Sequence, residues 1–155
     1  MSIGGATTVG LVCKDGVILA SEKRMAWGSF ILSKSAKKVF KVTDNVAVAC
    51  AGLVSDMQAV VRILSAYSSL FKLDRKRRMS VKAVAKLLSS LLFQRRLFPY
   101  FTQTIVGGVD DQGPALYSLE ALGSVIPDKY ACVGTGAEIA MGILEAEYRD
   151  GMSLE

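Results

Sequence analysis

The sequence contains no histidine among its 155 residues. This absence excludes Ser-His-Asp and Cys-His catalysis, and it excludes any metal site that needs an imidazole ligand. An enzyme built on this chain needs another general base. A free N-terminal amine, whose pKa is about 7.7–8.0 in model peptides, is one group that could serve.

Long hydrophobic runs are also missing. Hydrophobic residues make up 51% of the chain and the mean hydropathy is +0.35, yet no apolar run approaches the length needed to span a bilayer. We therefore expect buried elements or a large subunit interface, and no membrane partner. Residues 1–5 have neither a basic n-region nor an apolar h-region, so no signal peptide is expected.

Cysteines are few and widely spaced. Cys13, Cys50 and Cys132 each lie in an apolar stretch, and no Cys-x-x-Cys motif occurs. This pattern predicts buried thiols in a reducing compartment.

Positive charge is concentrated in one run, Lys72 to Arg78, within a chain of net charge +5. The run could form a nucleic-acid patch or a solvated helix end. Aromatic residues do not interleave with the charges, as they do in single-strand binders. We therefore favour the solvated helix end and expect no nucleic-acid partner.

The hydrophobic pattern predicts an α+β fold. Apolar β-rich runs are separated by turn signals, and apolar residues at three- and four-residue spacing mark helices, one of which begins at the N-cap residue Ser80. Ile139, Ile143 and Leu144 are expected to point inward from the last helix. Strands are predicted at 7–13, 17–21, 39–42, 46–51, 104–109, 115–119 and 130–133, and helices at 53–71, 80–98 and 137–148.

The first 38 residues carry the most specific motifs, and further motifs follow in order along the chain. Together they resemble the N-terminal-nucleophile hydrolases, and more narrowly the β subunit of the archaeal 20S proteasome. The motifs are Gly4-Gly5-Ala6-Thr7-Thr8-Val9-Gly10, Asp15-Gly16-Val17-Ile18-Leu19-Ala20, Glu22-Lys23-Arg24, Ser33 to Lys38, Ala51-Gly52, Phe98-Pro99-Tyr100, Gly107-Gly108-Val109-Asp110, Gly134-Thr135-Gly136 and Gly142-Ile143-Leu144-Glu145.

The resemblance implies a four-layer αββα sandwich with a short propeptide at residues 1–5 and the hydrolase domain at 6–155. Ser153-Leu154-Glu155 resembles the start of a further helix. The Arg-Asp and Gly-Asp-Gly segment, which supplies an acid and a serine to active members of the family, is absent. We therefore expect a truncated chain whose C-terminal part is missing and whose site is incomplete.

The resemblance also implies a mechanism. In the family, a propeptide is removed at a Gly–Thr bond, and the freed threonine attacks with its hydroxyl while its own amine acts as base. A lysine lowers the pKa of the hydroxyl and an acid orients that lysine. By the match, these residues are Lys38 and Glu22. The backbone N–H of Gly52 would donate to the oxyanion, and Thr135 falls where a serine commonly supports the amine.

Each of these residues also has an ordinary structural interpretation. Glu22 and Lys38 could be a surface ion pair, although the apolar residues around Lys38 favour an inward lysine. Gly52 could simply be the glycine at a helix start. Thr135 could be only an N-cap residue.

Ala6 departs from the family pattern because it occupies the position of the catalytic threonine. Without a hydroxyl, neither catalysis nor autocleavage between Gly5 and Ala6 is possible, so residues 1–5 should stay attached unless another subunit trims them. Three explanations remain open. The alanine could be an engineered change that traps the precursor, it could mark a naturally inactive β paralogue, or the alignment could slip by one residue so that Thr7 is the nucleophile. A slip would move the hydroxyl about 3.3 Å and point it to the opposite face of the strand.

The match places Met25, Ala36, Cys50 and Val54 around the substrate pocket. These residues are apolar or small, which predicts cleavage after apolar residues. The family further implies heptameric β rings stacked in pairs and capped by rings of α subunits, unfolded protein substrates, an ATPase regulator that acts indirectly, a cytoplasmic location, and neither a metal nor an organic cofactor.

Two other functions are compatible with the sequence. The chain could be a structural β subunit that supports ring assembly without cutting. It could also be another N-terminal-nucleophile amidohydrolase with a small-molecule substrate.

Overall fold

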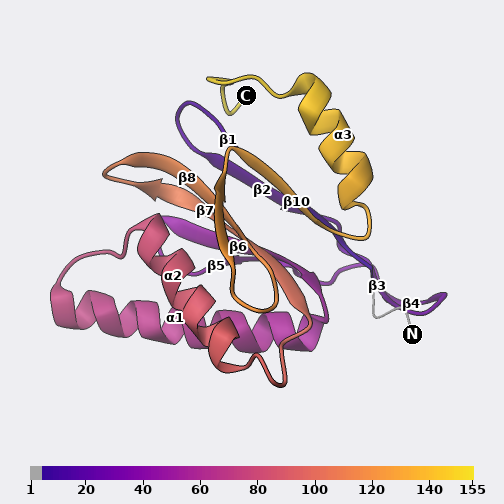
Figure 1. Ribbon diagram of the computed structural model, residues 1–155, viewed down its shortest axis with the longest axis horizontal. Helices are drawn as coiled ribbons and strands as arrows, with labels where there is room; N and C mark the ends of the chain where they lie inside the picture. The colour runs from indigo at the N-terminus through magenta and orange to yellow at the C-terminus, as the bar shows by residue number, and fades with distance from the viewer. Residues whose placement is uncertain (1–4) are drawn as a thin grey trace.

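The computed structural model describes residues 5–155, in which sheets of five, three and two strands are combined with three helices (Figure 1). The helices are α1 (Val54–Arg75), α2 (Val81–Gln94) and α3 (Ala137–Glu147). The strands are β1 (Thr7–Val12), β2 (Val17–Ser21), β3 (Met25–Trp27), β4 (Phe30–Ser33), β5 (Val39–Lys41), β6 (Val46–Gly52), β7 (Thr102–Asp110), β8 (Gly113–Leu119), β9 (Val125–Asp128) and β10 (Tyr130–Gly134).

All of the strand pairs are antiparallel. The three-stranded sheet has the order β10-β1-β2, and the five-stranded sheet has the order β5-β6-β7-β8-β9. The two hairpins that the turn signals predicted are confirmed, because β1 pairs with β2 and β5 pairs with β6. The short hairpin of β3 and β4 and the strand β9 were not predicted.

The five-stranded sheet has a buried core on each of its faces. Cys50 and Val106 face α1 and α2, whereas their neighbours Ala51 and Ile105 face the three-stranded sheet. This alternation follows from the two-residue period of a strand. It confirms that the strands, which are apolar at successive positions, belong to a sheet covered on both sides. In Figure 1, α1 and α2 lie below the five-stranded sheet, and α3 lies above β10 and β1.

The helices begin close to the predicted positions. Ser80 caps α2, and its hydroxyl accepts a hydrogen bond of 3.1 Å from the N–H of Ala83. Helix α1 runs to Arg75 and ends at Lys76, a residue with φ of 55°. The basic run therefore spans the last turn of α1 and the connection to α2, where its side chains are exposed.

Helix α3 differs from the sequence-based expectation in the direction of its apolar side chains. Leu144 is half-buried, but Ile139 and Ile143 are exposed. The inward direction predicted for these two isoleucines is therefore wrong in this chain. Helical periodicity identifies an apolar face but does not say what covers it. No helix within residues 5–155 is both long enough and apolar enough to cross a membrane.

Candidate active site

Ala6 lies directly before β1 and is only 3% exposed. It packs in the core between the two larger sheets, together with Ala51. Two residues further along, the buried hydroxyl of Thr8 donates to the carbonyl oxygen of Cys50 at 2.8 Å and lies 2.7 Å from the hydroxyl of Ser21. Positions 6 and 8 share one face of the strand, so the side chain at position 6 points toward β6.

Thr7 points away from this face. A Cβ placed on Gly136 would lie 2.2 Å from the Thr7 hydroxyl oxygen, which therefore lies beside the start of α3. The hydroxyls of Thr7 and Thr8 thus lie on opposite faces of the three-stranded sheet, because successive side chains of a strand alternate between its two faces.

Lys38 is a buried lysine, with a side chain that is 2% exposed. Its ammonium group donates to a carboxylate oxygen of Glu22 and, at 2.7 Å, to the carbonyl oxygen of Arg24. The second carboxylate oxygen of Glu22 accepts from the N–H of Arg24. Because a buried charge is costly unless it is paired, this arrangement fixes the ammonium group in one position.

Backbone bonds join this pair to the strands around it. The N–H of Glu22 donates to the carbonyl oxygen of Thr7 at 3.2 Å, and the N–H of Cys50 donates to that of Lys38 at 2.9 Å. Glu22 is thereby tied to β1 and Lys38 to β6. Two residues that are 16 positions apart in the sequence meet at the junction of the two larger sheets.

Gly52 ends β6, and only Leu53 separates it from α1; its φ is +128°. A Cβ at this position would lie 2.2 Å from the carbonyl oxygen of Phe101. Both the backbone conformation and the close approach therefore require glycine. The chain holds a backbone N–H at a fixed point between a strand and a helix.

The end of β10 and the residue that follows it contact Ala6. Gly134 has φ of +98°, and a Cβ there would lie 2.0 Å from the carbonyl oxygen of Ala6. The hydroxyl of Thr135 is 3.4 Å from that same oxygen, to which it donates. The Gln103 side chain accepts from the N–H of Gly134 at 3.0 Å. Gln103 carried no signal in the sequence, because a lone amide on a predicted strand has no motif.

Several residues of this region line one cavity of about 60 Å³. Its lining includes Gly5, Lys38 and Gly52, together with two of the four expected pocket residues, Met25 and Val54. A larger open cleft of about 530 Å³ lies between β8, β9, β10 and α3 and contains none of the predicted site residues.

The other two expected pocket residues lie outside the lining of the 60 Å³ cavity. Cys50 is fully buried in the core beneath α1, where desolvation raises the pKa of its thiol to about 12. Ala36 is half-buried, and its N–H donates to the carbonyl oxygen of Lys23 at 2.9 Å. Of the predicted processing segment, residues 1–4 lie outside the described residues. Within residues 5–155, no group of three or more acidic or cysteine side chains is arranged to hold a metal ion.

Comparison with known proteins identifies the family. A family profile described as "Proteasome subunit" matches residues 2–155. The chain is 51% identical over 155 residues to proteasome subunit beta 1 of Ignicoccus hospitalis, an alignment that covers all of this chain and 78% of the relative. The chain belongs to the proteasome β-subunit family.

Two further relatives agree with this assignment. The identity is 52% over 149 residues to proteasome subunit beta 1 of Cenarchaeum symbiosum, covering 96% of this chain and 77% of the relative. It is 48% over 151 residues to proteasome subunit beta 2 of Pyrobaculum calidifontis, covering 97% and 74%. Proteasome β subunits are generally threonine peptidases, and they assemble with other subunits in the 20S core.

Proposed function

We propose that this chain is a subunit of the β rings of a 20S proteasome, in which unfolded proteins are cut inside a closed barrel. In this proposal, heptameric β rings stack in pairs between rings of α subunits in the cytoplasm, and an ATPase regulator acts on the assembly indirectly. The packing of α1 and α2 on one sheet, and of α3 on the other, supports a four-layer αββα sandwich.

The proposed catalytic groups surround position 6. Lys38 would be the cation that activates a hydroxyl at this position, Glu22 would orient the lysine, and the N–H of Gly52 would stabilise the oxyanion. Thr135 would support the terminal amine. The observation that carries this proposal is the buried ammonium group of Lys38, which is paired with Glu22 and lines one cavity with Gly5 and Gly52.

Alanine at position 6 provides no nucleophile, so the chain in this form is proposed to be inactive and unprocessed. The peptide bond after Gly5 would remain intact, because its cleavage needs the hydroxyl of the following residue. The remaining proposed groups are the ones a threonine at this position would need.

A structural β subunit is the second candidate. Its role would be to complete the ring and support an active neighbour. The exposed apolar side chains of β4 and of α3 favour it, because they offer contact surface outside the cavity of the candidate site.

The variant Ala6→Thr distinguishes the two candidates. We expect the variant to lose residues 1–5, which its intact mass would show, and to hydrolyse fluorogenic peptides. The parent should keep its full mass. Ala6→Thr/Lys38→Ala is the matched control and should stay unprocessed. An Ala6→Thr chain that folds like the parent but is not processed would overturn the catalytic proposal in favour of the structural one. A parent chain that begins at Thr7 would show that the nucleophile position is shifted by one residue.

A further inference from the structure

Ser68 interrupts the apolar stripe along the inner face of α1. The preceding members of this stripe, Met57, Val61 and Leu64, are buried in the core. Ser68 lies one turn after Leu64 on the same face and is only 2% exposed. Its hydroxyl has no hydrogen-bond partner among residues 5–155. Because a buried hydroxyl without a partner is costly, a ligand that accepts a hydrogen bond would be favoured beside it.

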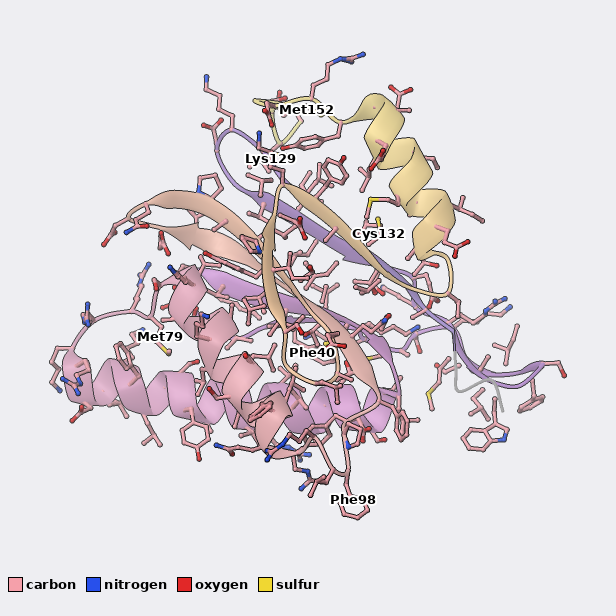
Figure 2. All side chains as sticks on the ribbon, viewed as in Figure 1. Phe40, Met79, Phe98, Lys129, Cys132 and Met152 are labelled. Carbon is pink, nitrogen blue, oxygen red and sulfur yellow. The ribbon has the colours of Figure 1, made fainter. Side chains whose placement is uncertain are left out.

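A cavity of about 270 Å³ lies beside Ser68. It forms where the end of α1, the connection from α1 to α2 and the turn between β5 and β6 meet. Figure 2 labels Met79, which lines the cavity from that connection. Ser68 and Ser69 line it from α1, and their small side chains leave the space open. A water molecule takes up about 30 Å³ in the liquid, so the cavity has room for a ligand of several non-hydrogen atoms.

The charged side chains that line this cavity are three cations and one carboxylate. The ammonium group of Lys72 donates to the Asp44 carboxylate at 3.1 Å, and that of Lys41 lies 3.6 Å from the other carboxylate oxygen. Arg78 is the third cation. The hydrogen bond from Lys72, and the charges of Lys72, Lys41 and Arg78, lower the pKa of Asp44. The three cations therefore act on one point, where a single carboxylate balances only one of them.

We propose that this cavity binds a small phosphate dianion, either free phosphate or the phosphoryl group of a small organic monoester. The two positive charges that Asp44 leaves unbalanced match the two negative charges of the ligand. Ser68 donates its hydroxyl to a phosphoryl oxygen and so gains the partner that the chain does not supply. Hydrogen bonds from lysine and arginine to phosphate are charge-assisted, which makes them stronger than bonds between neutral groups.

The phosphate cavity is separate from the candidate active site. Within the described part of the chain, its lining shares no residue with the 60 Å³ cavity that contains Lys38 and Gly52. The inference therefore goes beyond the proposed function and does not rest on it. The described lining also contains no aromatic side chain on which a base could stack, so the cavity suits a phosphate group better than a single-stranded nucleic acid.

Ser68→Ala tests the hydroxyl through two separate effects. In chloride buffer, urea unfolding should show the variant to be at least as stable as the parent, because the buried group that it removes has no partner in the chain. Isothermal titration calorimetry with inorganic phosphate should show a Kd about tenfold weaker than that of the parent, since a hydrogen bond to a charged group is lost. Ser90→Ala is the matched control. The Ser90 hydroxyl is exposed and donates to the carbonyl oxygen of Lys86 at 3.1 Å, so this variant should bind phosphate like the parent.

Two neighbouring arginines supply a matched pair of charge variants. Arg78→Gln should weaken phosphate binding about tenfold, because it removes a charge-assisted contact. The guanidinium group of Arg77 lies over the ring of Phe71, and Arg77 does not line the phosphate cavity. Arg77→Gln should therefore change the Kd by about twofold or less at physiological ionic strength, where salt screens distant charges.

Asp44→Asn should strengthen phosphate binding severalfold. The substitution removes the negative charge that competes with the ligand for Lys41, Lys72 and Arg78. A cluster that served only to stabilise the fold would gain nothing from this change. Weaker binding by Asp44→Asn, when circular dichroism shows that the variant is folded, would therefore overturn the proposal.

Further outcomes decide the inference independently of position 6. Equal binding of acetate and phosphate at one ionic strength would overturn it, because it would reflect general screening of the cations. Phosphate binding that Ser68→Ala and Arg78→Gln leave unchanged would also overturn it. Glycerol phosphate separates the two sources of the dianion. Tighter binding than inorganic phosphate supports an organic monoester, and equal or weaker binding supports free phosphate. These measurements use the parent chain and its cavity variants, so they hold whatever the result for Ala6→Thr.

Discussion

Lys38 and Glu22 form an ion pair whose two partners differ in exposure, with side chains that are 2% and 35% exposed. Removing one partner therefore differs from removing the other. Without Glu22, a charged lysine stays buried with only the Arg24 carbonyl as acceptor. Without Lys38, the carboxylate that remains can reach water.

This asymmetry predicts unequal costs. Glu22→Ala should lower the free energy of unfolding by about 2–3 kcal/mol, because it leaves a buried charge unpaired. Lys38→Met should cost less, about 1 kcal/mol or under, because an apolar chain of similar length fills the site. Urea unfolding curves measure both.

Lys41→Met supplies the control. Lys41 lies 3.6 Å from Asp44 in an exposed pair, so its replacement should change stability by about 0.5 kcal/mol or less. Equal losses for Glu22→Ala and Lys38→Met would contradict the argument from burial.

The position of Gly134 predicts that alanine substitutions at two glycines, Gly134 and Gly113, destabilise the fold unequally. Its φ of +98° and the 2.0 Å approach of a Cβ to the Ala6 carbonyl both oppose any side chain. Gly113 has a similar φ of +104°, but nothing lies within 4 Å of its Cβ. Gly113→Ala should therefore cost about 1 kcal/mol from backbone strain, whereas Gly134→Ala should cost about 3 kcal/mol or more.

Thermal unfolding followed by circular dichroism measures the difference between the two glycine variants. If Gly134→Ala were no more harmful than Gly113→Ala, the end of β10 would not be held against Ala6 as tightly as the structure indicates.

Much of the fold could be predicted from local sequence. Two-residue alternation and turn residues located the hairpins of β1–β2 and β5–β6, and Ser80 located the start of α2, because these signals depend on neighbours in the chain. The β3–β4 hairpin was missed because its strands are short and exposed and have no core to impose a pattern. The inward direction predicted for Ile139 and Ile143 was wrong, because helical periodicity identifies an apolar face but does not show whether another element covers it.

For the candidate site, the resemblance to proteasome β subunits selected Glu22, Lys38, Gly52 and Thr135, and the structure brings them near Gly5 and Ala6. Their catalytic roles remain predictions. The backbone support that Arg24 gives to Lys38, and the bond from Gly134 to Gln103, could not be predicted. Both depend on contacts between segments that no motif connects.

The burial of Cys50 predicts that its thiol is unreactive in the folded protein. Burial raises its pKa to about 12, against which a hydrogen bond with Thr102 acts only in part. At pH 8 its thiolate fraction is about one in ten thousand, and the site is closed to reagents. Cys132 is half-buried between β10 and α3, as Figure 2 shows, and desolvation also raises its pKa. A disulfide reagent should modify Cys132 first and Cys50 only on unfolding.

The same pKa predicts how stability changes in alkali. The unfolded thiol titrates near pH 9 and the folded thiol of Cys50 near 12. The protonated form is therefore favoured by folding, so this contribution to stability is complete below pH 9 and is lost as the pH rises toward 12. Cys50→Ala should reduce the loss of stability between pH 9 and pH 12 relative to the parent. Rapid labelling of Cys50 in folded protein at pH 8 would contradict the assigned burial.

The apolar surroundings of position 6 predict the specificity of the Ala6→Thr variant. Met25 and Val54 line the cavity that Gly5 and Lys38 share, and Trp27 lies beside them.

The carboxylate of Glu22 is held by Lys38 and by the N–H of Arg24. It is thus engaged and does not offer a free charge to a substrate side chain. A panel of fluorogenic peptides should show at least tenfold higher kcat/KM after leucine or phenylalanine than after lysine, because burying an unpaired cation beside apolar walls and the Lys38 ammonium group is costly. Met25→Glu should move the preference toward lysine. Preferred cleavage after lysine by Ala6→Thr itself would show that this cavity is not the specificity pocket.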